Sequence, residues 1–271
     1  MRAIWKGFVS FGLVTIPVNV GIAQDRKDPS FRTLVRETNR PVKQKRWDPD
    51  RDAEVQPEDT VKGWEVGKGR YVIVEEEELA RFAPRQEKTV QILQFVELPE
   101  VDPVFFEKAY WLEPQERAER PYALLVAALQ KTGRAAIGRF VLSTKEHLVL
   151  LRAVEGVLTL QTLYYPEDVR TDVQAEIRGR VEGVEVAQAE LDIAEQLVTG
   201  MTRPFDASEY ANETRQALLA MLEAKAEGQE VVAPEAQAEP APVVDLMAAL
   251  KASLAAAQAG GGEAEQERKA S

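Results

Sequence analysis

The sequence predicts an α+β fold that is mainly β, with a barrel core, a helical C-terminal arm and a flexible tail. Strand candidates fill most of the first 165 residues, and one clear helix interrupts them. Two helical stretches follow after Val184, and a linker rich in Pro, Ala and Glu comes after them. With 271 residues, the chain can bury one large core or two modest ones.

The opening run predicts strands that bend. Val9, Phe11 and Leu13 alternate with small or polar residues, and the apolar set then shifts by one position to begin again at Val14. A period-2 pattern with a one-residue slip is typical of a bulge or a sharp corner in a sheet. Pro17 removes a ladder donor and suits an edge or a change of strand partner. Such bending favours a barrel over a flat sheet.

Short apolar runs bounded by turn residues predict the other strands. These candidates are residues 70–74, 89–98, 108–113, 134–143, 147–154 and 157–165. Glu155-Gly156 joins the last two as a tight hairpin. The stretch GWEVGKG at 63–69 predicts a glycine-rich hairpin turn, because it lacks the glycine spacing and the hydroxyl residue of a phosphate-binding P-loop.

Helical signals are sparse in the first part of the chain and dominate the last part. Pro121 near the first turn and Gly133 as C-cap delimit the one clear helix, and EEEELARF predicts a short helical turn. In the arm, one stripe comprises Leu191, Ala194, Val198 and Met201. A second arm helix is predicted to start at a Ser208 N-cap and to stop at Gly228.

The C-terminal region predicts a tethered helix. Residues 231–242 are too poor in apolar side chains to fold, and Leu246, Leu250 and Leu254 then recur at helical spacing. A short amphipathic helix beyond a linker is more often a docking peptide than a core element. The predicted divisions are a core at 1–183, an arm at 184–230, a linker at 231–242, a docking helix at 243–258 and a disordered tail at 259–271.

Composition excludes several kinds of chemistry. The chain has no cysteine and one histidine, so disulfides, thiolate metal sites and paired imidazoles are impossible. His147 precedes a strand candidate and lies in no triad signature, and no spacing singles out a carboxylate pair among the many acids. Counting acids does not exclude a hydrolase that uses a carboxylate pair, but no motif supports one, and we expect no enzyme activity, no metal and no cofactor.

Targeting signals are also missing. Lys6 interrupts the opening apolar run, and no stretch reaches the roughly 18 apolar residues of a membrane helix. The sequence therefore predicts a cytoplasmic protein that does not bind membranes.

Charge is segregated along the chain despite the net charge of −11. Residues 1–50 carry ten Lys or Arg and five acids, whereas residues 151–200 carry four and ten. Six cations lie within fifteen residues: Arg32, Arg36, Arg40, Lys43, Lys45 and Arg46. In PVKQKRW the lysines alternate like one face of a strand, which suits successive phosphates of a nucleic acid. From composition alone, a solvated basic face is an equally good interpretation.

The chain resembles bacterial Ku proteins over nearly its whole length. In order, the resemblance is carried by RAIWKGFVSFGLVTIPV (2–18), SFRTLVRE (30–37), VKQKRW (42–47), TVKGWEVGKGRYVIVEEEEL (60–79), VDPVFFEKAYWLEP (101–114), YALLVAALQKTGRAAIGRFVL (122–142), LQTLYYPEDVR (160–170), ELDIAEQLV (190–198) and VVDLMAALKASL (243–254). Colinear blocks of this kind leave little room for chance similarity.

The resemblance implies a function without catalysis. It implies a Ku-type β-barrel, a homodimer whose bridge encircles double-stranded DNA ends, and a role in non-homologous end joining in the cytoplasm, at the nucleoid. It also implies that the helical arm packs on the partner subunit. The tail helix, with Leu246, Leu250 and Leu254, is then expected to contact a DNA ligase D-type enzyme.

Charge and strand placement select the candidate phosphate contacts. The first choices are Arg32, Arg36, Lys43, Lys45 and Arg46, and the second choices are Arg134, Arg139 and Lys145. The alternative is a protein–protein adaptor in which the basic face is merely solvated and the tail helix is the active part.

The chain departs from the family pattern in two places. Many bacterial relatives carry a Cys-x-x-Cys pair just after the basic segment, where this chain has WDPDRD at 47–52. Many also end in a lysine-rich tail, whereas the acids outnumber Lys251, Arg268 and Lys269 after residue 230. We therefore expect this tail not to add affinity for DNA.

Overall fold

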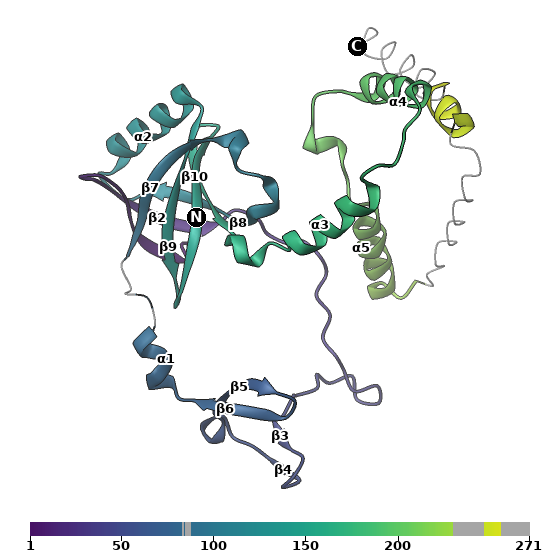
Figure 1. Cartoon of the computed structure of the whole chain (residues 1–271). Helices are drawn as coiled ribbons and strands as arrows, with labels where there is room; N and C mark the ends of the chain where they lie inside the picture. The colour runs from purple at the N-terminus through teal and green to yellow at the C-terminus, as the bar shows by residue number, and fades with distance from the viewer. Residues whose placement is uncertain (83, 85–87, 230–246, 256–271) are drawn as a thin grey trace. The chain divides into compact units, whose positions relative to one another are not determined.

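A computed structural model describes residues 1–82, 84, 88–229 and 247–255. The chain divides into two compact units, Met1–Thr171 and Asp172–Ser271. The division lies before the core boundary that the sequence predicts at residue 183. Each unit is described by itself (Figure 1).

The first unit is built on a closed barrel of seven strands in the order β1-β2-β8-β11-β10-β9-β7. The strands are β1 Trp5–Phe11, β2 Val14–Ile22, β7 Thr89–Glu97, β8 Phe106–Pro114, β9 Arg134–Leu142, β10 Lys145–Val154 and β11 Val157–Leu163. All neighbouring pairs are antiparallel except β1 and β7. This parallel pair closes the barrel, so its strands have no open edge. The predicted α+β, mainly β class and the barrel are confirmed.

The slip in the opening apolar pattern is a hairpin turn, so the predicted bulge or corner within a strand is wrong. Phe11 pairs with Val14, and Gly12 between them adopts a positive φ of 56°. Leu13 lies fully exposed at the tip. Because the chain reverses across this turn, the buried residues have odd numbers in β1, as at Val9, and even numbers in β2, as at Ile16. The apolar pattern therefore shifts by one position, as it would at a bulge.

The later predicted strands and the hairpin at Glu155-Gly156 are confirmed. Both residues of that turn have positive φ values, 49° and 83°, as a type I′ turn requires. Short 3-10 helices connect other elements: η2 Leu98–Glu100, η3 Pro103–Phe105 and η4 Pro166–Asp168.

Helix α2, Glu119–Thr132, packs against the barrel interior and covers one end in Figure 1. Tyr122, Leu125, Val126 and Leu129 join its core, and Gly133 ends the helix in the left-handed conformation, as predicted. The Tyr122 hydroxyl donates to the Leu112 carbonyl at 2.7 Å and accepts from the Leu158 amide at 2.8 Å. The helix is therefore tied to two strands as well as packed on them.

Residues 23–88, here called the excursion, leave the barrel after β2 and return at β7. They contain β3 Trp47–Asp48, β4 Ala53–Glu54, η1 Pro57–Asp59, β5 Lys62–Gly67, β6 Arg70–Val74 and α1 Glu76–Phe82. The hairpin turn predicted at 63–69 and the short helical turn are confirmed. None of the described excursion residues is buried.

The second unit is helical. It contains α3 Thr171–Val181, α4 Gln188–Met201, η5 Ala207–Glu209 and α5 Glu213–Ala226, and a further helix covers residues 247–255. The predicted Ser208 N-cap is wrong, because Asn212 caps α5 by accepting from the Arg215 amide. Helix α3 was not predicted. No residue of α3, α4 or α5 is buried, so these helices have no core of their own.

Candidate nucleic-acid interface

The six Lys and Arg residues at 32–46 are here called the basic cluster. Two of them, Arg36 and Arg40, lie on a small loop at residues 33–42, which Arg32 directly precedes. A β-bridge joins Leu34 to Pro41, and the Val42 amide donates to the Thr33 carbonyl at 3.0 Å. The Val35 amide donates to the Arg40 carbonyl at 2.9 Å. Reversal of the chain at this loop places Leu34 beside Pro41, so Arg36 and Arg40 lie on one short loop.

The predicted strand through Lys43 and Lys45 is wrong. Residues 42–46 have no regular secondary structure, and β3 begins only at Trp47. Without a neighbouring strand, nothing holds the alternation that the sequence suggested. The 33–42 loop holds Arg36 and Arg40, whereas Lys43 and Lys45 lie in the irregular segment that follows it.

Most of the predicted phosphate contacts are solvated cations without an ion pair. Among the described residues, no ion pair involves Arg32, Arg36, Arg40, Lys43 or Arg46, and all five are exposed. The fifteen residues 32–46 hold one acid, Glu37, against six cations. Unpaired exposed cations at this density create a local positive potential that can attract a polyanion.

Lys45 differs from its neighbours because it pairs with Glu54 of β4. Its ammonium is therefore partly neutralised, although both side chains are exposed enough for solvent to weaken the pair. Lys27, outside the predicted set, pairs with Asp25 at 2.7 Å, and this hydrogen bond and charge lower the pKa of Asp25. Of the first-choice residues, Lys45 is thus the weakest candidate for a phosphate contact.

The side chain of Asp48 stabilises the turn within the WDPDRD segment at 47–52. The Asp48 carboxylate accepts from the amides of Asp50 at 2.9 Å and Arg51 at 3.4 Å. Arg51 also approaches this carboxylate at 3.7 Å, and Asp52 adopts a positive φ of 49°. These local bonds hold the β3-β4 turn at the position where the family resemblance leads one to expect a cysteine pair.

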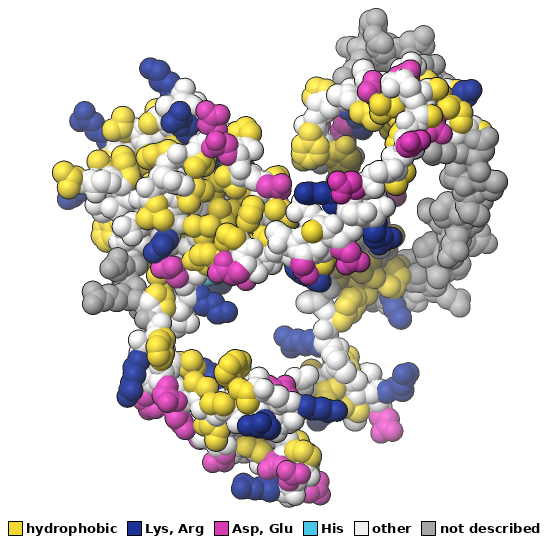
Figure 2. Space-filling model, in the orientation of Figure 1, with side chains coloured by type: hydrophobic (Ala, Val, Ile, Leu, Met, Phe, Trp, Pro, Cys, Tyr) yellow, Lys and Arg dark blue, Asp and Glu magenta, His cyan; other side chains and the backbone are white. Residues whose placement is uncertain are grey.

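Exposed aromatic residues of the excursion were missed by the sequence reasoning. Trp64 is 68% exposed and Tyr71 62% exposed on the β5-β6 hairpin, and Trp47 is 55% exposed on β3. Figure 2 shows hydrophobic and basic side chains next to each other over this hairpin. The available signal was that a hairpin of two short strands has no interior in which large aromatic rings could be buried.

The second-choice residues lie on the barrel and do not form one group. Lys145 begins β10 directly after the turn and pairs with Leu142, whereas Arg139 pairs with Leu148 further along β9 and approaches Glu146 at 3.9 Å. Arg134 lies at the opposite end of β9, in register with Glu97. The structure therefore does not bring these three residues together.

The tail residues are described only in part. Leu250 and Leu254 lie four residues apart on the helix at 247–255 and are half-buried, whereas Leu246 is outside the described residues. The predicted linker at 231–242 and the tail at 259–271 are also outside them.

No described group of three or more His, Asp or Glu side chains is arranged to hold a metal ion. Within the same residues, every helix is too short or too polar to cross a membrane.

The closed barrel, the long basic excursion and the helical C-terminal unit together define a class of protein. Comparison with known protein families shows which class it is. A profile of the Ku70/Ku80 beta-barrel domain matches residues 10–193. The chain belongs to the Ku family.

Curated relatives carry the name "Non-homologous end joining protein Ku". The one from Heliobacterium modesticaldum is 41% identical over 254 residues, covering 94% of this chain and 91% of its own length. That from Anaeromyxobacter sp. strain K is 42% identical over 265 residues, covering 97% and 88%. That from Bacillus subtilis is 34% identical over 256 residues, covering 94% and 82%.

Proposed function

We propose that this protein binds the ends of double-stranded DNA, without regard to sequence, as a ring-shaped homodimer in non-homologous end joining. The observation that carries the proposal is the exposed basic cluster on the excursion of a Ku-family barrel, of which only Lys45 pairs with an acid among the described residues. Its relatives bear the name of this repair pathway. Lys and Arg contacts to phosphates position a duplex but read no bases, so any broken end is a suitable ligand.

Ring closure supplies the preference for ends. A duplex is about 20 Å across, so one excursion cannot surround it, and two copies must contribute. A linear duplex threads into a closed ring from its terminus, whereas an intact circle has no terminus to thread. The preference for ends is thus topological, and the affinity comes from counterions released from the phosphates.

Dimerisation is supported by the exposed apolar side chains of the second unit. On α4, Val198 is 67% exposed and Met201 is 65% exposed, although both lie on the stripe that the sequence predicts. A helical stripe of this kind is stable in water when another surface covers it. A second copy of this chain is the occupant that the proposed ring requires.

A mobility-shift series tests end binding directly. We expect the protein to retain linear duplex and to release covalently closed circles of the same sequence, with hairpin-capped duplex between them. Equal affinity for linear and circular DNA would disprove the proposal.

Paired variants link the activity to the basic cluster. Arg36→Ala with Lys43→Ala should weaken binding to linear duplex at least tenfold. Arg120→Ala with Lys131→Ala removes the same charge from exposed positions of α2 and should leave binding nearly unchanged. An equal loss in both double variants would show that only overall charge matters, and the excursion would not be the binding site.

We also propose that the tail recruits a DNA ligase D-type enzyme, which the amphipathic helix at 247–255 supports. The adaptor alternative rests on this same helix. Deleting residues 231–271 separates the two: an end-binding scaffold keeps its DNA affinity and loses stimulation of ligation, whereas a pure adaptor has no DNA affinity to keep.

A further inference from the structure

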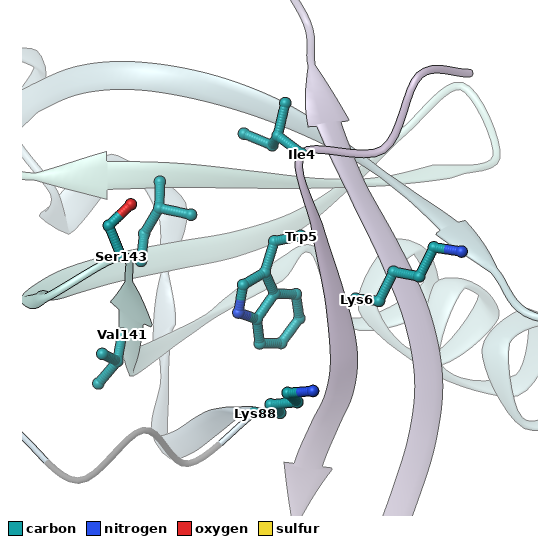
Figure 3. A pocket seen from close by; sticks show the side chains of 7 residues that line it. Ile4, Trp5, Lys6, Lys88, Val141 and Ser143 are labelled. Atoms are coloured by element: carbon teal, nitrogen blue, oxygen red, sulfur yellow. The ribbon is translucent and has the colours of Figure 1, made fainter.

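A pocket of about 370 Å³ opens on the barrel, and none of its lining residues belongs to the basic cluster. It is lined by Ile4, Trp5 and Lys6 from the start of the chain, by Lys88 just before β7, and by Val141, Leu142 and Ser143 at the end of β9 (Figure 3). This volume suits a ligand of small-molecule size. Nothing in the proposed end-binding mechanism uses the pocket.

Trp5 is held in place at the centre of the pocket. Its indole meets the buried Phe140 ring edge to face, with ring centroids 4.9 Å apart and planes at 82°. A Cβ atom added at Gly7 would lie 2.3 Å from the Trp5 ring and 2.2 Å from the Lys88 carbonyl oxygen. Gly7 therefore allows the ring and the Lys88 backbone to approach each other. The indole is a fixed aromatic surface and not a mobile surface side chain.

The charge of the pocket is positive. Its lining contains two lysines and no acid. Figure 3 shows the Lys88 side chain next to the Trp5 ring, whereas Lys6 extends away from the ring on the other side of the strand. Lys88 is thus the cation best placed to meet a ligand that lies on the indole, and Lys6 adds a more distant charge.

Ser143 supplies a hydroxyl group at a strained position. It lies in the turn between β9 and β10 with φ of 60°, a conformation that non-glycine residues adopt at a cost. Trp5 lies between Ser143 and Lys88 in the view of Figure 3. Strained residues of this kind are often found at ligand sites, where a side chain is useful despite its backbone cost.

We propose that this pocket binds a nucleotide, with the base stacked on Trp5 and the phosphate held by Lys88. Every base has a flat face that stacks on an aromatic ring, and an ammonium group neutralises a phosphate without reading sequence. Ile4, Val141 and Leu142 give the base an apolar wall, which a bare inorganic anion would not use. The nucleotide is either an unpaired terminal nucleotide of a DNA end or a free nucleotide.

Calorimetric titration of the full chain at low salt tests the site, with deoxyadenosine monophosphate as the probe. We expect one site per chain, with deoxyadenosine and inorganic phosphate each binding at least tenfold more weakly, because each lacks one half of the recognised group. Absence of binding at millimolar concentrations of the monophosphate would overturn the proposal.

Substitutions distinguish the pocket from general positive charge. Lys88→Ala should weaken binding of the monophosphate about tenfold, as expected for loss of one charged hydrogen bond. Lys131→Ala removes an exposed lysine of α2 outside the pocket and should change nothing. Equal weakening by both variants would overturn the proposal.

A second variant guards against loss of folding. Ser143→Gly relieves the positive φ, so the melting temperature should be unchanged or higher, while the monophosphate binds more weakly. Unaltered binding in Ser143→Gly and in Trp5→Leu, which removes the aromatic ring, would overturn the proposal.

Two duplexes distinguish the sources of the nucleotide, and this arm rests on the proposed end binding. If the ligand is a DNA terminus, a duplex with one unpaired terminal deoxyadenosine binds more tightly than a blunt duplex, and Lys88→Ala abolishes the difference. Equal binding of the two duplexes, together with binding of the free monophosphate, identifies a free nucleotide. Failure to bind either duplex would reject end binding and leave the monophosphate titration as an independent test.

Discussion

At the scale of single residues, the barrel depends on a few buried polar contacts as well as on apolar packing. Tyr122 connects the helix that covers the barrel to β8 and to β11 through one hydroxyl group. The sequence placed Tyr122 in the helix, but hydrogen bonds to backbone atoms far along the chain cannot be read from a periodic pattern. The ion pair between Lys45 and Glu54 could not be predicted either, because it forms only once the β3-β4 turn brings the two residues together.

Tyr122→Phe should lower the free energy of unfolding by about 1–2 kcal/mol, because it leaves the buried Leu158 amide without its partner. Tyr164→Phe, at a half-exposed position on the same unit, is the matched control and should change stability little. Urea unfolding followed by circular dichroism measures both. No loss in Tyr122→Phe would show that water replaces the hydroxyl.

Burial raises the pKa of Tyr122 and of Tyr110 above the ordinary value of 10.0. Because the folded pKa lies above the unfolded pKa, the stabilisation is complete below about pH 10 and is lost as pH rises through the folded pKa. We expect the melting temperature to fall above pH 10, and to fall less steeply in Tyr122→Phe. Identical alkaline profiles for the two proteins would contradict this expectation.

At the scale of elements, the strands of the barrel were predictable because their side chains alternate between core and solvent. The irregular segments were not, since the backbone of residues 42–46 belongs to no strand and has no periodic pattern that a sequence could show. Helix α3 did carry a signal, with Val173, Ile177 and Val181 at helical spacing, but its shortness and Gly179 weaken it. The five unpaired cations were found by charge density, whereas their loop geometry required the structure.

If the proposed dimer forms through the α4 stripe, Val198→Asp with Met201→Asp should yield a monomer, because two carboxylates on the stripe oppose an apolar interface. Light scattering coupled to size exclusion measures the mass. Glu195→Asp with Thr199→Ser, conservative changes on the same helix, should leave the dimer intact. A double aspartate variant that remains dimeric would place the interface elsewhere.

At the scale of the whole molecule, net charge is a poor guide to the ligand. The chain is acidic overall, yet six of its 34 Lys and Arg residues lie within the fifteen residues 32–46, beside one acid. In the proposed function, acids elsewhere disfavour nonspecific contact, and this cluster attracts the polyanion. Which residues line an assembled ring depends on a second copy, and a single sequence holds no record of that geometry.

The salt dependence of DNA binding measures how many phosphates the protein neutralises. If about six phosphates are neutralised, a fourfold rise in salt weakens binding by roughly 10³. Lys43→Ala removes two contacts from a homodimer, so the slope of log K against log salt should become less steep by about two. Lys131→Ala should preserve the slope. A slope that Lys43→Ala leaves unchanged would remove Lys43 from the phosphate contacts.

Because β1 pairs with β7, the barrel closes without the excursion, which can therefore be regarded as an exchangeable segment, or cassette. Phe8, Val9 and Ser10 pair with Thr89, Val90 and Gln91, so the strands on either side of the cassette are already joined by β1. By register, the end of β2 and the start of β7 are roughly 20 Å apart, which about ten Gly and Ser residues can span. Because no described excursion residue contributes to the core, evolution and engineering can both lengthen, shorten or graft this segment without redesigning the scaffold that carries it.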